Sequence, residues 1–151
     1  MDSTVRLANE NDKSVIIDFQ LKMATETENL NLDFTIVSQG VSNVFLEPKH
    51  GVYYVCELDG EIAGVLLTTY EWSDWRNATI IWIQSVYVLP AFRKFGVFKT
   101  MYAHIKQMVL HSPAYCGIRL YVDITNKTAQ KVYEAVGMNG NHYSLFEDMK
   151  A

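Results

Sequence analysis

The sequence predicts a mixed α/β (α+β) domain in which helices flank one central, mostly antiparallel mixed sheet. Three observations carry this prediction. Helical and strand periodicities alternate along the chain, Asp59-Gly60 is a tight-turn dipeptide between two strand-like runs, and residues 79–88 are rich in β-branched and aromatic side chains. The expected order of elements is βααβββαβαβ. A chain of 151 residues is long enough for a single domain, residues 1–151, with a core of its own.

The first third of the chain is expected to form one strand and two helices. Residues 5–7 are the candidate strand, and Asp12 is placed to cap a helix that continues to about Glu28. Asp33 is placed to cap a second helix, because apolar residues recur at three- and four-residue steps across residues 36–45. Each helix therefore has an apolar side to bury.

The middle of the chain is expected to form three strands. These strands cover residues 52–58, 61–70 and 79–88, and the polar segment Glu71–Asn77 separates the last two as an insert. Pro90 ends the third strand.

The last third is expected to alternate between helices and strands. A helix runs from Gly96 to about Leu110. The chain then closes with a strand over residues 118–122, a helix over residues 127–136 between the cap Asn126 and the stop Gly137, and a last strand over residues 142–146.

Charge and hydropathy exclude two classes of partner. Acidic residues outnumber basic ones by 17 to 13, which gives a net charge of −4. A nucleic-acid binder normally carries a basic stripe, so this balance argues against one. The longest apolar runs, such as residues 80–83, are far too short to span a bilayer, and the N-terminus lacks the apolar region of a secretory signal. The sequence therefore predicts a cytoplasmic domain that binds neither nucleic acid nor membrane.

Cysteine and histidine usage argues against two kinds of site. Cys56 and Cys116 lie among apolar or aromatic neighbours and are expected to be buried thiols in a reducing compartment. The four histidines are scattered without ligand spacing. We therefore expect neither a metal site nor a Ser-His-Asp arrangement.

One segment combines a buried strand, a short basic loop and a helix start. It covers residues 86–98, and Arg93, Lys94 and Lys99 supply positive charge around Gly96. Free backbone N–H groups and the positive end of the macrodipole make a helix start suitable for phosphate. Taken alone, the segment is equally consistent with an ordinary strand-to-helix turn that carries solvated basic residues.

Two blocks of residues resemble GCN5-related N-acetyltransferases (GNAT). The segment reads Val-x-Val-x-Pro and then Arg-x-x-Gly-x-Phe, which is similar to the acetyl-CoA signature Gln/Arg-x-x-Gly-x-Gly/Ala. A second block is similar to the family's segment of strand, Asn, Ala, Tyr and Gly-Phe, and it consists of Leu120-Tyr121-Val122, Asn126, Ala129, Tyr133 and Gly137-Met138. The Glu-Trp-Ser-Asp-Trp-Arg run at residues 71–76 is similar to a bacterial branch of the family. The resemblance implies the GNAT fold.

The resemblance also implies acetyl-CoA as the acetyl donor and assigns residues to it. Backbone groups of Val86, Tyr87 and Val88 would pair with the pantetheine arm as though it were an extra strand. Asn126 would hydrogen-bond the pantetheine end, and Tyr133 would protonate the departing thiolate, for which a phenol with a pKa of about 10 is a competent acid. The pyrophosphate would lie near Lys99 and against the backbone amides of Arg93, Lys94, Phe95, Gly96, Val97 and Phe98.

Two positions depart from the family pattern. Phe98 stands where glycine or alanine normally lets a phosphate approach, although its backbone N–H is retained. Gln84 stands where several members carry a glutamate as general base, and glutamine can only orient a water or the acceptor. Proton removal must therefore come from another carboxylate, from a water chain or from an amine already neutral on binding.

Two acidic segments are candidates for the pocket of the acceptor amine. Glu26 and Glu28 end the first helix, and Glu71 precedes Trp75 in the insert. Carboxylates could hold an ammonium and take its proton, with Glu71 as the first choice, and a tryptophan face adds cation–π contact of about 0.5–2 kcal/mol. The alternatives are a solvated helix end for the first pair and hydrophobic packing under a loop for the tryptophan.

The sequence thus leads to two hypotheses of function. The first is transfer of an acetyl group from acetyl-CoA to a primary amine of a small molecule or peptide, by direct attack in a ternary complex. The second is a non-catalytic acyl-CoA-binding module, which Gln84 and Phe98 favour, whereas Tyr133 and the carboxylates favour the enzyme. Members of the family are often dimers, so a homodimer is a further alternative.

Overall fold

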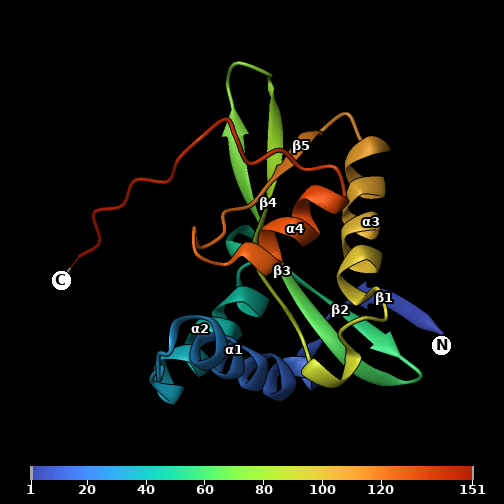
Figure 1. The fold of residues 1–151 in the computed structure, drawn as a ribbon, viewed down its shortest axis with the longest axis vertical. Helices are drawn as coiled ribbons and strands as arrows, with labels where there is room; N and C mark the ends of the chain where they lie inside the picture. The colour runs from blue at the N-terminus through green and yellow to red at the C-terminus, as the bar shows by residue number, and fades with distance from the viewer. Residues whose placement is uncertain (1, 151) are drawn as a thin grey trace. The chain divides into compact units, whose positions relative to one another are not determined.

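The computed structural model describes residues 2–150, and its contacts divide the chain into two compact units, residues 1–119 and residues 120–151 (Figure 1). The first unit holds a sheet with three α-helices, and the second holds one helix. The strands are β1 (Ser3–Leu7), β2 (Val52–Leu58), β3 (Glu61–Ser73), β4 (Ala78–Val88) and β5 (Tyr115–Arg119). The helices are α1 (Lys13–Glu28), α2 (Phe34–Leu46), α3 (Val97–Leu110) and α4 (Lys127–Ala135), with short 3-10 turns at Glu10–Asp12, Pro48–His50 and Pro90–Phe92.

The sheet is mixed and mostly antiparallel, as the sequence predicts. Its strands lie in the order β1-β2-β3-β4-β5, with antiparallel pairing up to β4 and parallel pairing between β4 and β5. Asp59 and Gly60 join β2 to β3, and both have a left-handed backbone, with φ of 52° and 82°. This is the backbone of the tight hairpin turn that Asp-Gly favours.

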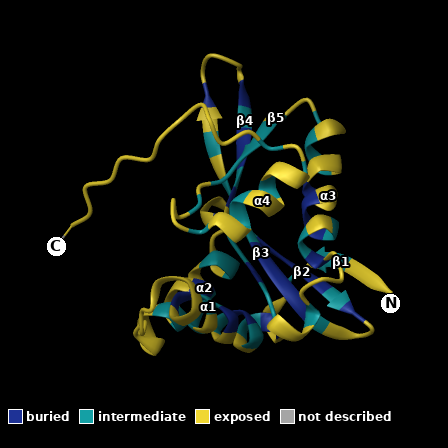
Figure 2. Cartoon of the chain, in the orientation of Figure 1, coloured by how far each residue is buried: buried dark blue, intermediate teal, exposed yellow. Residues whose placement is uncertain are grey.

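The two faces of the sheet are covered by different helices. Side chains alternate along each strand, and Tyr53 and Val55 of β2 and Val65 of β3 face α1 and α2, where they form a core with helix residues such as Ile16 and Phe19. The other face packs against α3, which comes so close that a Cβ at Gly64 would lie 2.9 Å from Val97 Cγ1. Figure 2 shows that buried residues concentrate in the sheet and in the helices that pack against it, whereas the tip of the β3–β4 hairpin is exposed.

Strand β4 contains a β-bulge at Gln84. Ser85 lies opposite Leu67 and Ile83 lies opposite Thr68, which leaves Gln84 as an extra residue without a partner on β3. Such a bulge bends a strand and redirects its side chains. Pairing with β5 ends at Trp82, so within residues 2–150 the stretch from Ile83 to Val88 is paired only on its β3 side.

Three residues predicted from the local sequence to cap or end a helix are confirmed in that role. The Asp33 carboxylate accepts a hydrogen bond of 3.0 Å from the backbone N–H of Ile36 at the start of α2. Asn126 Oδ1 accepts one of 3.1 Å from Ala129 N at the start of α4. Gly137, with φ of 95°, follows the end of that helix.

The predicted cap Asp12 has a different role. Its side chain accepts two hydrogen bonds from the Arg6 guanidinium, at 2.8 and 3.1 Å, and one of 2.8 Å from Asn9 N. Asn9 caps the preceding 3-10 turn instead. The prediction was wrong because β1 brings a cation beside the carboxylate, and charge-assisted bidentate pairing is stronger than a helix cap.

Replacement of Asp12 by asparagine is expected to lower the free energy of unfolding by about 1.5–3 kcal/mol at pH 7. The hydrogen bond from Arg6, followed by that from Asn9, holds the pKa of Asp12 below its ordinary value of 3.8. A lowered native pKa means that the stabilisation is complete above that ordinary value and is lost as the pH falls through the lowered one. Urea denaturation of both proteins should therefore show a difference at pH 7 that shrinks in strong acid. Asp74→Asn, in an exposed turn, is the control and should change stability by less than about 0.5 kcal/mol.

Other expectations about the sequence need correction. No strand forms over residues 142–146, which are irregular and exposed, because no strand of the sheet pairs with them. The strand expected at residues 118–122 begins and ends earlier, as β5. The insert expected at residues 71–77 is shorter, because β3 continues to Ser73 and only a four-residue turn separates it from β4.

Two further observations concern exposure and the membrane. Cys56 is buried as expected, but Cys116 is exposed, because the outer edge of β5 carries no further strand among the described residues. Within residues 2–150 no helix is long and apolar enough to cross a bilayer.

Candidate active site

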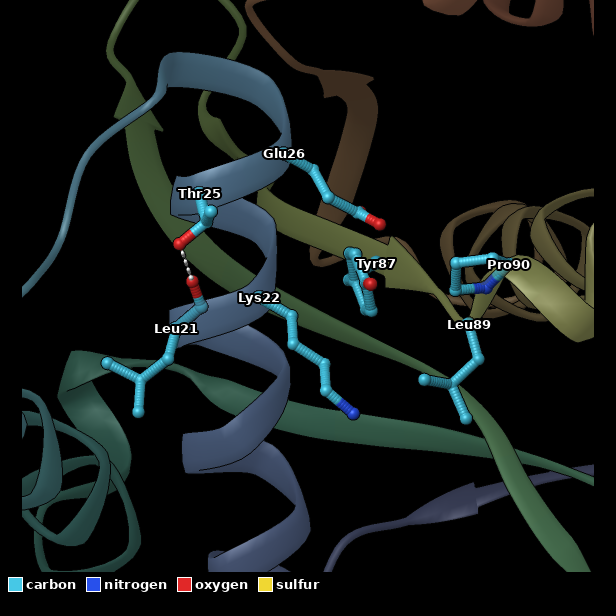
Figure 3. A pocket seen from close by; sticks show the side chains of 7 residues that line it. All are labelled: Leu21, Lys22, Thr25, Glu26, Tyr87, Leu89 and Pro90. Atoms are coloured by element: carbon cyan, nitrogen blue, oxygen red, sulfur yellow. Dashed lines mark hydrogen bonds between the residues drawn. The ribbon is translucent and has the colours of Figure 1, made fainter.

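A pocket of about 480 Å³ opens in the first unit, between the last turns of α1 and the end of β4 (Figure 3). The α1 side carries a cation and a carboxylate, and the floor contains a tyrosine. The lining residues are Leu21, Lys22, Thr25, Glu26, Tyr87, Leu89 and Pro90. A second hollow, on α2, is lined by uncharged polar side chains such as Ser38 and Asn43 and offers no acid or base.

Glu26 is the acidic group of this pocket. Its Oε2 accepts a hydrogen bond of 2.9 Å from Arg93 Nη2, and Figure 3 shows its side chain reaching from α1 toward Tyr87. Burial and a hydrogen bond with Glu26 raise the pKa of Tyr87 to about 12. The tyrosine therefore stays neutral, and Glu26, the carboxylate among the lining residues, is paired with Arg93 in this structure.

The free edge of β4 ends beside this pocket. Leu89 N donates to Ala63 O across the sheet at 2.9 Å. Because hydrogen-bonded and non-bonded pairs alternate in an antiparallel ladder, the backbone groups of Val86 and Val88 point away from β3. The Val88 carbonyl accepts 2.9 Å from Arg93 Nε. This edge can therefore hydrogen-bond an extended amide-containing chain laid beside it.

A left-handed loop connects that edge to α3. Lys94 and Gly96 have φ of 79° and 72°, and α3 begins at Val97 with no acidic residue in its first turn. Left-handed residues of this kind can direct successive backbone N–H groups to one side, and here they precede the positive end of a 14-residue helix. Lys94 and Lys99 are exposed beside it. The loop has the donors and the charge that a pyrophosphate requires.

Phe98 is accommodated along the helix. Its ring stacks on Tyr102, one turn further along α3, with 6.0 Å between the ring centroids and 28° between the planes. Tyr102 is buried, so this contact anchors the Phe98 ring on α3. The backbone N–H of Phe98 is retained at the helix start, as the sequence requires for a phosphate site.

Glu71 belongs to a second cluster on the α1–α2 face of the sheet. It accepts 2.8 Å from Trp82 Nε1, and Arg119 Nη1 contacts both carboxylate oxygens at 2.9 and 3.1 Å. The hydrogen bond from Trp82, together with Arg119, lowers the pKa of Glu71. A carboxylate held ionised in this way is a weak base, so the arrangement favours orientation or charge over proton removal.

The remaining predicted acceptor residues are dispersed. Gln84 is exposed at the bulge, where its Oε1 accepts 3.5 Å from Thr69 Oγ1. Trp75 lies in the hairpin turn with 90% of its surface exposed, and Glu28 is exposed at the end of α1; neither lines the pocket. Of the four predicted acceptor-binding residues, only Glu26 lines the pocket.

The second unit carries the last two predicted site residues. The Asn126 side chain caps α4, and Tyr133 lies half-buried on the same helix. Burial raises the pKa of Tyr133 above its ordinary value of 10. The phenol therefore keeps its proton at neutral pH, as an acid must.

Sequence reasoning missed three side-chain roles. The side chain of Tyr87 lines the pocket, whereas only its backbone was assigned, and the Arg93 guanidinium, expected only to supply positive charge around Gly96, pairs with Glu26. Arg119 was assigned no role, although it pairs with Glu71. Only a single cation in an otherwise apolar strand marked Arg119 in the sequence. Within residues 2–150 no group of three or more His, Cys, Asp or Glu side chains could hold a metal ion.

Comparison with known proteins identifies the family. The model of the acetyltransferase (GNAT) family matches residues 20–138. A possible acetyltransferase from Clostridium difficile 630 has a solved structure that is 34% identical, with a TM-score of 0.91 over 99% of this chain and 98% of that chain. The chain belongs to the GNAT family of acetyltransferases.

More distant solved structures share the fold. One is the aminoglycoside N-acetyltransferase AAC(6')-Iy in complex with CoA, at 14% identity and a TM-score of 0.79, with 99% of this chain and 96% of that chain covered. Another is the aminoglycoside acetyltransferase meta-AAC0020 from an uncultured soil metagenomic sample in complex with sisomicin, at 15% identity and a TM-score of 0.74, with 98% and 97% covered. No protein of curated function matches the chain significantly.

Proposed function

We propose that this chain is an N-acetyltransferase that moves an acetyl group from acetyl-CoA to a primary amine by direct attack in a ternary complex. The observation that best supports this activity is the free edge of β4. It leads into the left-handed loop before α3 and ends beside a pocket containing Glu26. Acetyl-CoA supplies an activated thioester acetyl group. The residues present fit it, because extended backbone, loop amides and exposed lysines match an amide-containing arm and a pyrophosphate.

The predicted site residues would each bind a substrate or transfer a proton. Val86 and Val88 would bind the pantetheine arm through their backbone, and Asn126 would hydrogen-bond its end. Glu26 would hold the ammonium of the acceptor, and the amide of Gln84 would orient a water that takes the ammonium's proton, so that the neutral amine can attack the thioester. Tyr133 would donate the proton that the leaving thiolate needs. Neither cysteine lines the pocket, which supports transfer without a covalent enzyme intermediate.

The acceptor is a small molecule or a peptide with a primary amine. The fold-sharing aminoglycoside acetyltransferases support a small polyamine as the first class to test. The rival function is a non-catalytic acyl-CoA-binding module, which the glutamine at the bulge favours because it removes the usual base.

The test is incubation with acetyl-CoA and a panel of aminoglycosides, polyamines and N-terminal peptides, with release of free thiol as the readout. Calorimetry with CoA alone runs in parallel. Amine-dependent thiol release supports the enzyme. Binding of CoA without turnover on any amine supports the rival, and absence of CoA binding contradicts both.

Replacement of Glu71 by glutamine is expected to raise the Michaelis constant of the best panel amine about fivefold, with little change for acetyl-CoA. The variant removes the charge that orients Trp82 and Arg119 but keeps the size of the side chain. Because the pKa of Glu71 lies below its ordinary value, its ionisation does not change near neutrality and the pH–rate profile should keep its shape. Asp74→Asn on the same hairpin is the control. A profile displaced to higher pH would instead identify Glu71 as the base, and an unchanged Michaelis constant would remove it from the site.

A further inference from the structure

Arg93 joins the loop before α3 to the wall of the pocket. Its Nε donates to the Val88 carbonyl at 2.9 Å, and its Nη2 donates to Glu26, 67 residues earlier, also at 2.9 Å. Its Cζ lies 5.5 Å from the centroid of the Tyr87 ring. One guanidinium therefore contacts the free edge of β4, the pocket floor and the pocket's carboxylate.

The ion pair between Arg93 and Glu26 is well formed but exchangeable. The two side chains are 49% and 36% exposed, so water reaches both partners. Exposed pairs of this kind contribute about 0.2–1 kcal/mol. A pyrophosphate is a stronger partner for a guanidinium than this exposed carboxylate, because it carries more negative charge and offers more acceptor oxygens, whereas Glu26 receives a single hydrogen bond from Arg93.

Lys22, the other cation of the pocket, does not take part in this competition. Its Nζ pairs with Asp18, four residues earlier on α1, at 2.9 Å. Arg93 is thus the cation that pairs with Glu26 among the described residues. While that pair is intact, the negative charge of the pocket is neutralised, and an incoming ammonium must displace a guanidinium.

We propose that Arg93 exchanges Glu26 for the pyrophosphate of acetyl-CoA, and that this exchange frees the Glu26 carboxylate to bind the acceptor's ammonium. This inference rests on the proposed function. Donor binding at the loop then prepares the acceptor pocket. Because coupling between two ligands is reciprocal, an ammonium on Glu26 also strengthens donor binding.

The test measures the dissociation constant of CoA by calorimetry at low ionic strength, where surface charge pairs are least screened. Glu26→Gln removes the partner that competes for Arg93. CoA should then bind about two- to fivefold more tightly, which corresponds to the strength of an exposed ion pair. Asp74→Asn removes an exposed carboxylate in the turn between β3 and β4 that does not line the pocket, and it should leave the constant within about 1.5-fold.

A second background separates partner exchange from simple charge removal. Arg93→Met keeps much of the side-chain length but removes the guanidinium, so it should weaken CoA binding. In that background, Glu26→Gln should no longer tighten it. Melting temperatures of all variants show that they are folded.

Tightening by Glu26→Gln that disappears in the Arg93→Met background supports the exchange. Equal tightening in both backgrounds means that only long-range repulsion was relieved, and no tightening means that the pair does not compete with the donor; either result overturns the inference. Absence of CoA binding by the unmodified chain would instead contradict the proposed function itself.

Discussion

Tyr133→Phe is expected to turn over the acceptor about 10²–10⁴-fold more slowly while binding acetyl-CoA almost as well as the unmodified chain. The phenylalanine keeps the ring on α4 and removes only the proton that the leaving thiolate would take. Burial raises the pKa of Tyr133, so the phenol stays protonated well above neutral pH. Steady-state kinetics give the turnover, and calorimetry with CoA gives the affinity.

Loss of a buried hydrogen bond could imitate a catalytic defect, because it costs about 1–3 kcal/mol of stability by itself. The melting temperature of the variant measures that effect. Tyr53→Phe is the matched control, since Tyr53 is buried on β2 against the α1–α2 core. A folded Tyr133→Phe protein with normal turnover would limit this tyrosine to packing.

Gly96→Pro should weaken acetyl-CoA binding by at least about 100-fold, or about 2.7 kcal/mol. Gly96 has φ of 72°, whereas proline is fixed near −65° and lacks the backbone N–H. The substitution therefore removes one donor from the loop and turns the neighbouring donors away from it. Calorimetry with acetyl-CoA measures the loss.

If the Gly96→Pro protein folds poorly, Gly96→Ala provides a second test of the loop as the pyrophosphate site. An added Cβ at Gly96 would meet no atom within 4 Å, so alanine pays only the left-handed strain of about 1–2 kcal/mol and retains the N–H. Gly60→Ala imposes the same strain at φ of 82° in the β2–β3 turn. Gly96→Ala should bind more weakly and Gly60→Ala normally. A folded Gly96→Pro protein with unchanged affinity would contradict the loop as the pyrophosphate site.

Features set by neighbouring residues could be predicted from the sequence. Asp33 and Asn126 cap their helices through hydrogen bonds that span three residues. The Asp59-Gly60 turn likewise depends on two backbone conformations only. Such interactions depend only on a few consecutive residues, so residue type and spacing are enough to predict them.

Features that depend on distant residues could not be predicted. Asp12 pairs with Arg6 because β1 and the start of α1 meet in space, which overrides its capping propensity. Glu26 and Arg93 are 67 residues apart and become neighbours only when α1 packs beside the end of β4. Residues 142–146 carry strand-like side chains but have no strand to pair with. In each case a partner elsewhere in the chain decides the outcome.

The extra residue in β4 changes the phase of the strand. Before Gln84, even-numbered residues such as Trp82 share a face with Glu71; after it, the odd-numbered Tyr87 belongs to the α1 side. Because side chains alternate with a period of two, Trp82 and Tyr87 would lie on opposite faces of a regular strand, and the extra residue between them places both on the α1 side. If Gln84 were deleted, β4 could pair regularly with β3, and Trp82 and Tyr87 would both remain on the α1 side.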